Sequence, residues 1–384
     1  MRLIHTSDWH LGRSLHGESL LGHQESFLSW LLEQAVSHRV DAVVVAGDVY
    51  DRAVPGTDAV SLLDRSLAAF AAAGIRVVLT SGNHDSAVRL GFGRALSDAA
   101  GIHLRTTVAD ITRPVVVSDA YGEVGIYGVP YLLPDAVMAD LGAARSHTAV
   151  LAAVTGRIMQ DASARGLART VVVAHAFVTG GSACESERDI RVGGIGDVPA
   201  AVFAGCTYLA LGHLHGQQKI TGVPAGGYSG SPLAFSFSER GHTKSVTLAE
   251  IDGDGRTETA LLPVPVPRPL REVRGRLADL LARADGDLAD LAGAWVKVVL
   301  TDPVRPTAPM ERLRGKWPHT LVLDFDPEGG LLDADADLRR LARATDPVEV
   351  CGLFTEYAGG APPDEAEWRV LRDVVEAAQH TETV

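Results

Sequence analysis

A short apolar segment that ends in an acid is the feature that most restricts the fold of this chain. Residues 40–51 read VDAVVVAGDVYD, so a run of valines precedes Gly47 and Asp48. A β-branched run bounded by polar residues predicts a strand buried on both faces in the middle of an α/β sheet. Asp48 follows where this strand leaves the sheet, and the carboxyl ends of strands are where open α/β sheets bind ligands. Because burying a carboxylate beside an apolar strand is costly without a cation or hydrogen-bond donors, Asp48 needs partners from elsewhere in the chain.

Four other predicted strands end in the same kinds of side chain. The turns after these strands carry Asp, His or Asn, namely Asp8 and His10, then Asn83, His84 and Asp85, then His175, and finally His213 and His215. One such residue at a strand end is more often a turn residue or a helix cap than a ligand. Five strand ends of this kind, all with oxygen or imidazole donors, favour a metal site instead.

The donor types also restrict the metal. Asp8 and Asp48 are the two carboxylates, and the other donors are neutral, so a pair of divalent ions would leave the site net positive. Two ions about 3.5–4 Å apart can activate water and hold a phosphate for in-line displacement. Asp48, on the middle strand, is the natural bridge between them. A mixed oxygen and nitrogen set suits Mn, Fe, Co or Zn better than Ca.

Composition sets the outer limits of the interpretation. The 384 residues are enough for one large α/β domain and one or two smaller ones. The net charge of −13 is unusual for a protein that binds nucleic acid alone, because phosphates are normally met by clustered Lys and Arg. We expect no membrane span and no secretory signal. Cys184, Cys206 and Cys351 lack C-x-x-C spacing, which favours a reducing, cytoplasmic compartment and argues against a sulfur-bound metal.

Strands and helices alternate over the first part of the chain. Helices are predicted at residues 23–38 and from Thr57, which can cap the second one, and this alternation indicates a largely parallel sheet covered on both faces. Three later segments are predicted as strands that close a second sheet, at residues 217–221, 227–231 and 244–251. Residues 179–199 form a long loop rich in Gly, Ser and charge, which is either a mobile surface connection or functional.

The sequence pattern changes in the C-terminal third of the chain. Proline stands at every second position of residues 263–269, which predicts a stiff linker and a domain boundary. A small α/β domain is expected after it. Two amphipathic helices are predicted at residues 347–357 and 363–378, and they either fold back on the protein or dock onto a partner helix.

Taken in chain order, these motifs resemble a known family. D-x-H at Asp8, G-D-x-x-D at Asp48, G-N-H-D at residues 82–85, His175 and G-H-x-H at residues 212–215 resemble the calcineurin-like metallophosphoesterase superfamily. The flanking segments HTSDWHLGRSLHG, GDVYDRAVP, CESERDIRVGG and YSGSPLAFSFSE narrow this to a resemblance to the bacterial SbcD nuclease family. The resemblance runs to about Pro269 and more loosely beyond.

The resemblance implies a domain plan of the α/β class. Residues 1–265 would form a metallophosphoesterase β-sandwich flanked by helices. Residues 270–341 would form a small α/β capping domain that helps seat DNA. Residues 346–384 would form C-terminal helices that dock onto a coiled coil.

The resemblance also implies roles for individual residues. One metal would be bound by Asp8, His10, Asp48 and His215, and the other by Asp48, Asn83, His175 and His213. His84 would orient the phosphate and protonate the leaving 3′ oxygen, which suits an imidazole whose pKa lies near neutrality. The alternative for His84 is a purely structural role. Asp51 and Asp85 would hold ligands in place rather than bind metal. Structural or surface positions are expected for His5, His23, His38 and His103.

The implied function is that of a DNA nuclease subunit. It would use two divalent ions, Mn²⁺ above others, as a 3′-5′ double-strand exonuclease and a single-strand or hairpin endonuclease in DNA repair, recombination and replication. Its partners would be a second copy of itself, double-stranded DNA ends and hairpins, and SbcC, an SMC-type ATPase whose DNA-binding surface would account for the acidic charge. Its location would be cytoplasmic and nucleoid-associated.

Two other functions remain open at this point. A general metallophosphoesterase acting on small phosphoesters or cyclic nucleotides would share the metal site but would have little use for a capping domain and docking helices. A non-catalytic scaffold is hard to reconcile with an unbroken set of ligands together with His84.

Overall fold

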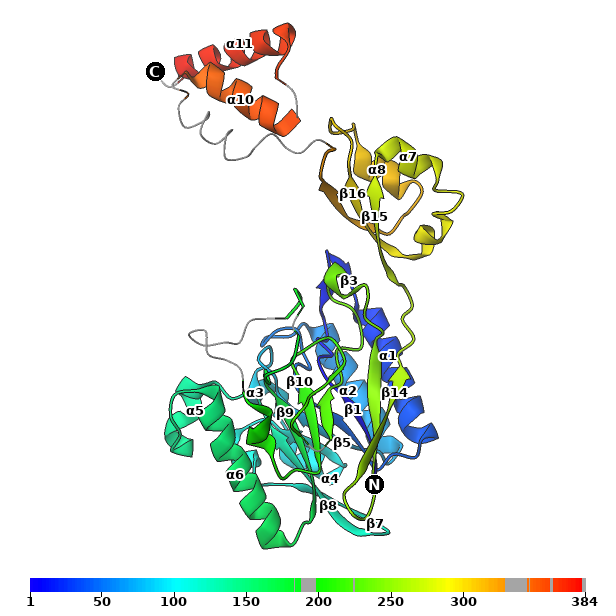
Figure 1. The fold of residues 1–384 in the computed structure, drawn as a ribbon, viewed down its shortest axis with the longest axis vertical. Coiled ribbons are helices and arrows are strands. Elements are labelled where there is room, and N and C mark those ends of the chain that lie inside the picture. The colour runs from blue at the N-terminus through cyan, green and yellow to red at the C-terminus, as the bar shows by residue number, and fades with distance from the viewer. Residues whose placement is uncertain are drawn as a thin grey trace. The chain divides into compact units, whose positions relative to one another are not determined.

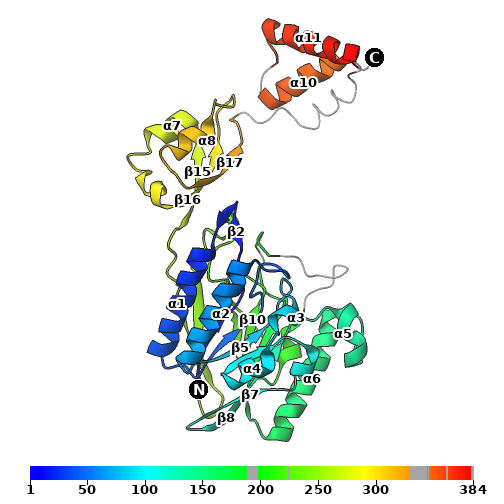
Figure 2. The same ribbon diagram turned by 180° about the vertical axis from the view of Figure 1, so that it is seen from behind.

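The computed structural model describes residues 1–182, 184–187, 198–223, 225–328, 344, 346–359 and 362–381. They form two compact units, Met1–Pro267 and Arg268–Val384, shown from two sides in Figures 1 and 2. The division falls within the proline-rich segment. Parts of three predicted regions lie outside the described residues, namely 183 and 188–197 of the loop, 329–341 of the capping domain, and 360, 361 and 382–384 of the C-terminal helices.

The first unit contains two six-stranded sheets. The first sheet has the order β14-β13-β1-β4-β5-β6, with β14 Thr257–Pro263, β13 Ser245–Ile251, β1 Arg2–Thr6, β4 Ala42–Val45, β5 Arg76–Thr80 and β6 Ile102–Arg105. The second has the order β11-β12-β10-β9-β8-β7, with β11 Gln218–Lys219, β12 Gly226–Tyr228, β10 Tyr208–Gly212, β9 Arg169–His175, β8 Gly122–Val129 and β7 Val115–Asp119. Four consecutive strands of each sheet run parallel to one another, β1, β4, β5 and β6 in the first and β12, β10, β9 and β8 in the second.

The two sheets pack face to face around a shared core. Val44, Val78, Val173 and Tyr208 from both sheets are buried between them. Helices α1 Leu21–Ser37 and α2 Thr57–Ala72 cover the outer face of the first sheet. Helices α5 Pro134–Leu141 and α6 His147–Arg165 cover the second sheet and lie on the opposite side of the sandwich (Figures 1 and 2).

Two details of the prediction are wrong. Residues 244–251 do not close the second sheet, because β13 pairs with β1 in the first sheet. β13 is buried on both faces. One face packs toward α1 and α2, and the opposite face packs toward the second sheet. Its apolar residues therefore fit either sheet, and only a long-range pairing selects one. Thr57 does not cap α2 either, since Gly56 occupies the cap position and no side chain caps this helix.

Smaller elements complete the first unit. They are β2 Ser14–Leu15, β3 Glu18–Ser19, α3 Ala87–Leu90 and α4 Arg94–Ala99, with 3-10 turns at Val108–Asp110, Ala200–Phe203 and Phe237–Glu239. The N–H of Val264 donates to the carbonyl of Lys244 at 2.9 Å, so the start of the proline-rich segment continues the pairing of β14 with β13.

The second unit begins with a small parallel sheet. Its order is β15-β16-β17, with β15 Leu270–Gly275, β16 Trp295–Leu300 and β17 Thr320–Phe325. Helices α7 Leu277–Ala282 and α8 Pro309–Arg314 and a 3-10 turn at Ala289–Gly293 pack with it around the fully buried Trp317.

Two helices, α10 Pro347–Gly359 and α11 Glu365–Thr381, pack against each other. Gly352 makes this contact possible, because a Cβ there would lie 2.0 Å from the indole of Trp368. Across the described parts of the chain, no helix combines the length and the apolar character that crossing a membrane would require.

Candidate metal centre

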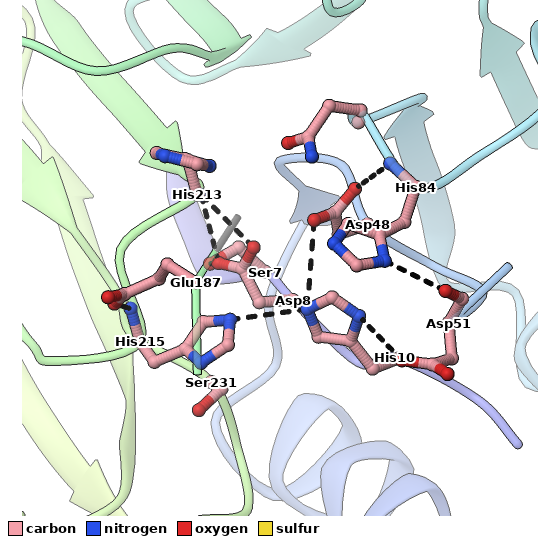
Figure 3. A network of polar contacts seen from close by, with 12 residues as sticks. Ser7, Asp8, His10, Asp48, Asp51, His84, Glu187, His213, His215 and Ser231 are labelled. Atoms are coloured by element: carbon pink, nitrogen blue, oxygen red, sulfur yellow. Dashed lines mark hydrogen bonds and ion pairs between the residues drawn. The ribbon is translucent and has the colours of Figure 1, made fainter. Parts of the chain in front are cut away.

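The carboxyl ends of parallel strands from both sheets bring the five strand-end motifs to one place. Figure 3 shows Asp8, Asp48, His84 and His213, which come from four of these strand ends, close together. The first sheet brings the residues that follow β1, β4 and β5, and the second brings those at the ends of β9 and β10. Asp8, Asp48 and Asn83 come from the first, and His175 and His213 from the second. The structure therefore brings together side chains that are up to about two hundred residues apart, as the pair Asp8 and His213 illustrates.

Distances between donor atoms define the cluster. The Nε2 atoms of His10 and His215 lie 3.2 Å apart, and Asp48 Oδ2 lies 3.6 Å from Nε2 of His10 and 3.6 Å from Nε2 of His175. Among the described residues, four groups each bring their possible ligand atoms within 4.8 Å of one another: Asp8, His10 and His215; Asp8, Asp48 and His175; His10, Asp48 and His84; and Cys184, Glu187 and His215. Asp48 belongs to two of them.

The other predicted residues lie at the same place. Asn83 Oδ1 is 2.9 Å from His175 Nε2. The backbone N–H of His213 donates to both carboxylate oxygens of Asp8 at 3.1 Å, and its ring centroid lies 5.4 Å from that of His175. His84 donates its backbone N–H to Asp48 Oδ1 at 2.8 Å.

Hydrogen bonds to carbonyl groups determine the tautomers of two imidazoles. His175 Nδ1 lies 2.9 Å from the carbonyl oxygen of Ala46, and His84 Nδ1 lies 2.8 Å from that of Asp51. A carbonyl oxygen only accepts, so Nδ1 carries the hydrogen in both rings. In neutral His175 the Nε2 lone pair then faces Asn83 Oδ1 and Asp48 Oδ2. Three acceptor atoms converge, and this donor set fits a divalent cation.

The electrostatics of the cluster agree with a cation site. Burial and the nearby Asp48 raise the pKa of Asp8 well above its usual range. Burial, followed by the nearby His215, lowers the pKa of His10 well below its usual range, and burial lowers the pKa of His175. Without a cation the pocket thus opposes both negative carboxylates and positive imidazoles. A divalent ion would stabilise carboxylates as anions and imidazoles as neutral ligands.

The backbone of the site is strained at the candidate ligands themselves. Asp8, His10, Asp48 and His213 have positive φ values of 53°, 44°, 48° and 109°. Such values are uncommon in residues other than glycine, cost about 1–3 kcal/mol each and concentrate at functional sites.

Two glycines allow the strand ends to approach closely. A Cβ on Gly47, whose φ is 81°, would lie 2.4 Å from His175 Nδ1, and a Cβ on Gly82 would lie 2.1 Å from Asp48 Oδ1. No other residue type fits either position without a shift of the backbone.

Asp85 and Asp51 contact the turns that carry the candidate ligands. The Asp85 carboxylate accepts hydrogen bonds from the backbone N–H groups of Val49, Tyr50 and Gly82 at 2.8–3.0 Å, and so joins the turns after β4 and β5. Burial and the charge of Asp48 nevertheless raise its pKa to about 7. Asp51 accepts from His84 through its carbonyl, and its carboxylate lies 3.6 Å from His10 Nδ1.

Several contacts of the site were not predicted. Phe235 packs edge-on against the rings of His10 and His215 at centroid distances of 5.1 and 5.4 Å. Ser186, Glu187 and Glu239 hydrogen-bond directly or through one another to His215. The family resemblance includes the segments that carry these residues. The residues were nevertheless assigned no role from the sequence, because no ligand pattern was found in their spacing.

His5 illustrates the histidines expected to be structural. It is buried, with Nε2 at 3.0 Å from the carbonyl oxygen of Leu211 and Nδ1 at 3.1 Å from the hydroxyl of Tyr208. His103 Nδ1 pairs with Asp98 at 2.8 Å.

The fold and the cluster of donors are those of a phosphoesterase. The model of the calcineurin-like phosphoesterase family matches residues 1–217, which include every predicted site residue. The chain therefore belongs to the calcineurin-like phosphoesterase family. A second model, described as the type 5 capsule protein repressor C-terminal domain, matches residues 266–356.

Within this family the chain is similar to the SbcD subunits of SbcCD nucleases. It is 33% identical over 316 residues to the SbcD subunit of nuclease SbcCD from Escherichia coli K12, with 78% of each chain covered. It is 34% identical over 328 residues to the SbcD subunit of the same nuclease from Rhodobacter capsulatus, with 80% of this chain and 78% of that one covered. The predicted resemblance to SbcD is confirmed, and it supports the nuclease over the general phosphoesterase.

Proposed function

We propose that this protein is the metal-dependent DNA nuclease subunit of an SbcCD-type complex. The observation that carries the proposal is the convergence of the strand-end donors on Asp48 in a chain whose relatives are SbcD subunits of nuclease SbcCD. The reaction is hydrolysis of phosphodiester bonds, as a 3′-5′ exonuclease on double-stranded ends and an endonuclease on single strands and hairpins. Its role lies in DNA repair, recombination and replication.

Two divalent ions, Mn²⁺ above others, would occupy the centre. Asp8, His10, Asp48 and His215 would hold one, and Asp48, Asn83, His175 and His213 would hold the other. When bound, such ions activate water and stabilise charge on the phosphoryl oxygens.

His84 is the catalytic residue in this proposal. Its ring lies 4.7 Å from that of His10, and the carbonyl of Asp51 holds its Nδ1–H at 2.8 Å. Nε2 is therefore the atom that can carry a proton to the leaving 3′ oxygen, and the Asp51 contact keeps the ring oriented for that transfer. Asp51 and Asp85 keep the ligand-bearing turns in place.

We further propose that the protein acts as a homodimer. Val88, Phe92 and Leu96, on and between α3 and α4, are 81%, 87% and 82% exposed. A cluster of large apolar side chains at this exposure is typical of a surface that another protein covers. A second copy of the chain suits this patch, which follows directly on the turn of Asn83 and His84.

The second unit supplies the remaining proposed contacts. Residues 270–341 would serve as a capping domain that helps seat DNA, and residues 346–384 would dock onto an SbcC-type ATPase. Phe354 of α10 and Val370 and Val374 of α11 are at least 60% exposed and offer apolar surface for a coiled coil. The partner would supply much of the DNA-binding surface and so offset the net charge of −13. A cytoplasmic, nucleoid-associated location follows from this partnership.

A cleavage assay tests the function. Purified protein is incubated with Mn²⁺ and an end-labelled DNA hairpin, with and without the coiled-coil ATPase, beside His84→Ala. We expect cutting that depends on Mn²⁺ and on His84 and that increases with the partner. Hydrolysis of small phosphoesters without any cutting of DNA would refute the proposal in favour of the general phosphoesterase. Absence of metal binding would instead favour a scaffold.

A further inference from the structure

His215 is held by a buried polar network that lies outside the candidate ligands. Lys244 and Glu239 form an ion pair at 2.5 Å, and their side chains are 3% and 0% exposed. The ammonium of Lys244 also donates to the carbonyl of His215 at 3.0 Å and to the hydroxyl of Ser231 at 2.9 Å. A buried ion pair of this kind needs such additional hydrogen bonds, because desolvation of the two charges offsets much of their attraction.

Ser186 connects this ion pair to the imidazole of His215. Its Oγ lies 2.7 Å from Glu239 Oε1 and 2.6 Å from His215 Nδ1. A hydroxyl has one hydrogen to donate, and the carboxylate paired with Lys244 can only accept. The hydrogen of Ser186 therefore goes to Glu239, and His215 Nδ1 donates to Ser186. This leaves Nε2 of neutral His215 without a hydrogen, facing His10 Nε2 at 3.2 Å.

We infer that Ser186 is a positioning residue that fixes His215 in the tautomer whose Nε2 can bind metal. Glu239 and Lys244 orient the hydroxyl of Ser186, and Ser186 in turn orients His215. The affinity of the site formed by Asp8, His10, Asp48 and His215 therefore depends on residues that do not themselves bind the metal. The inference rests on the proposed function, because it assumes that this site holds a divalent cation. Ordered partners of metal-binding imidazoles tune affinity in this way.

The segment around Ser186 is held by contacts that do not involve its hydroxyl. Glu187 accepts a hydrogen bond from the backbone N–H of His215 at 2.6 Å, and Arg13 donates to the carbonyl of Ser186 at 2.9 Å. The guanidinium of Arg13 also lies 4.8 Å from the centre of the Phe235 ring. Removal of the hydroxyl alone should therefore leave the backbone of the segment in place.

Titration of the full-length protein with Mn²⁺ tests the inference. Isothermal calorimetry and the electron paramagnetic resonance of bound Mn²⁺ are compared for the parent, Ser186→Ala and Ser186→Thr. In Ser186→Ala we expect one of the two sites to weaken by about 10- to 100-fold and the other to be unchanged. Ser186→Thr keeps a hydroxyl and should recover affinity close to that of the parent.

Ser238→Ala is the matched control. Its hydroxyl also contacts the segment, by accepting from the N–H of Glu185 at 3.4 Å, and its other partner is Ser236, which is not a candidate ligand. We expect parent-like affinity at both sites. Two unchanged sites in Ser186→Ala, or equal weakening of both, would overturn the inference and leave the proposed function intact. A parent protein that binds no Mn²⁺ would overturn both.

Discussion

Replacement of Gly82 by alanine tests whether the close approach of two strand ends sets the activity. A Cβ at this position would lie 2.1 Å from Asp48 Oδ1 and 2.4 Å from the Asp48 backbone nitrogen, whereas ordinary contact begins at 3.4 Å. The obstructing atoms are the candidate bridging ligand and its backbone, not the end of a flexible side chain. The turn after β5 and the turn after β4 must therefore separate by about 1 Å, and a displacement of that size costs on the order of 10²-fold in rate.

The assay is single-turnover cleavage of an end-labelled hairpin at saturating Mn²⁺. Gly241→Ala is the control, because a Cβ there meets nothing within 4 Å. We expect Gly82→Ala to cut about a hundredfold more slowly. It should also bind both ions more weakly, since Asp48 is a ligand of both proposed ion sites. Circular dichroism establishes that the variant is folded. A folded Gly82→Ala that cuts at the parent rate would refute the reasoning that strand-end spacing limits catalysis.

Three further predictions concern catalysis, stability and assembly. His84→Ala should lose about 10²- to 10⁴-fold in cleavage yet retain both ions by calorimetry, while Asp48→Asn should lose both, and equal metal loss in the two would contradict these roles. Asp119 pairs with Arg169 at 2.7 Å and with the N-terminal ammonium at 2.8 Å, and these contacts lower its pKa, so Asp119→Asn should destabilise the protein by about 1–2 kcal/mol in urea at pH 7. Because the pKa is lowered on folding, this difference should shrink progressively as pH falls below about 4, and a constant difference would argue against the ion pair. Phe92→Asp should yield monomers in sedimentation, whereas Tyr121→Asp, also exposed but distant in sequence, should not.

The sequence was sufficient to predict which side chains lie together at the sheet edges, but not the way in which they are held. Asp8, Asp48 and His175 could be identified because each follows an apolar strand, and strand ends of parallel sheets meet at one edge. The membership of β13 in the first sheet could not be predicted, because its apolar residues fit either sheet and the pairing with β1 spans most of the first unit.

The support of His215 was inaccessible for a related reason. Ser186 and Glu239 are 53 residues apart in the sequence. Their contact depends on the tertiary fold, and so do the positive φ values at Asp8 and Asp48. Local propensity contains no signal for either.

The two sheets contribute different halves of the centre, so the site lies across their seam. None of the described strands belongs to both sheets. An ion bound jointly by Asp48 and His175 would therefore link the two sheets directly. Binding energy in such a site is also cohesion of the sandwich: at a free Mn²⁺ concentration a hundredfold above the dissociation constant, each ion would add about 2.7 kcal/mol to the free energy of unfolding. The ions that support catalysis would then also stabilise the fold. Chelation would therefore lower the free energy of unfolding as well as abolish cleavage.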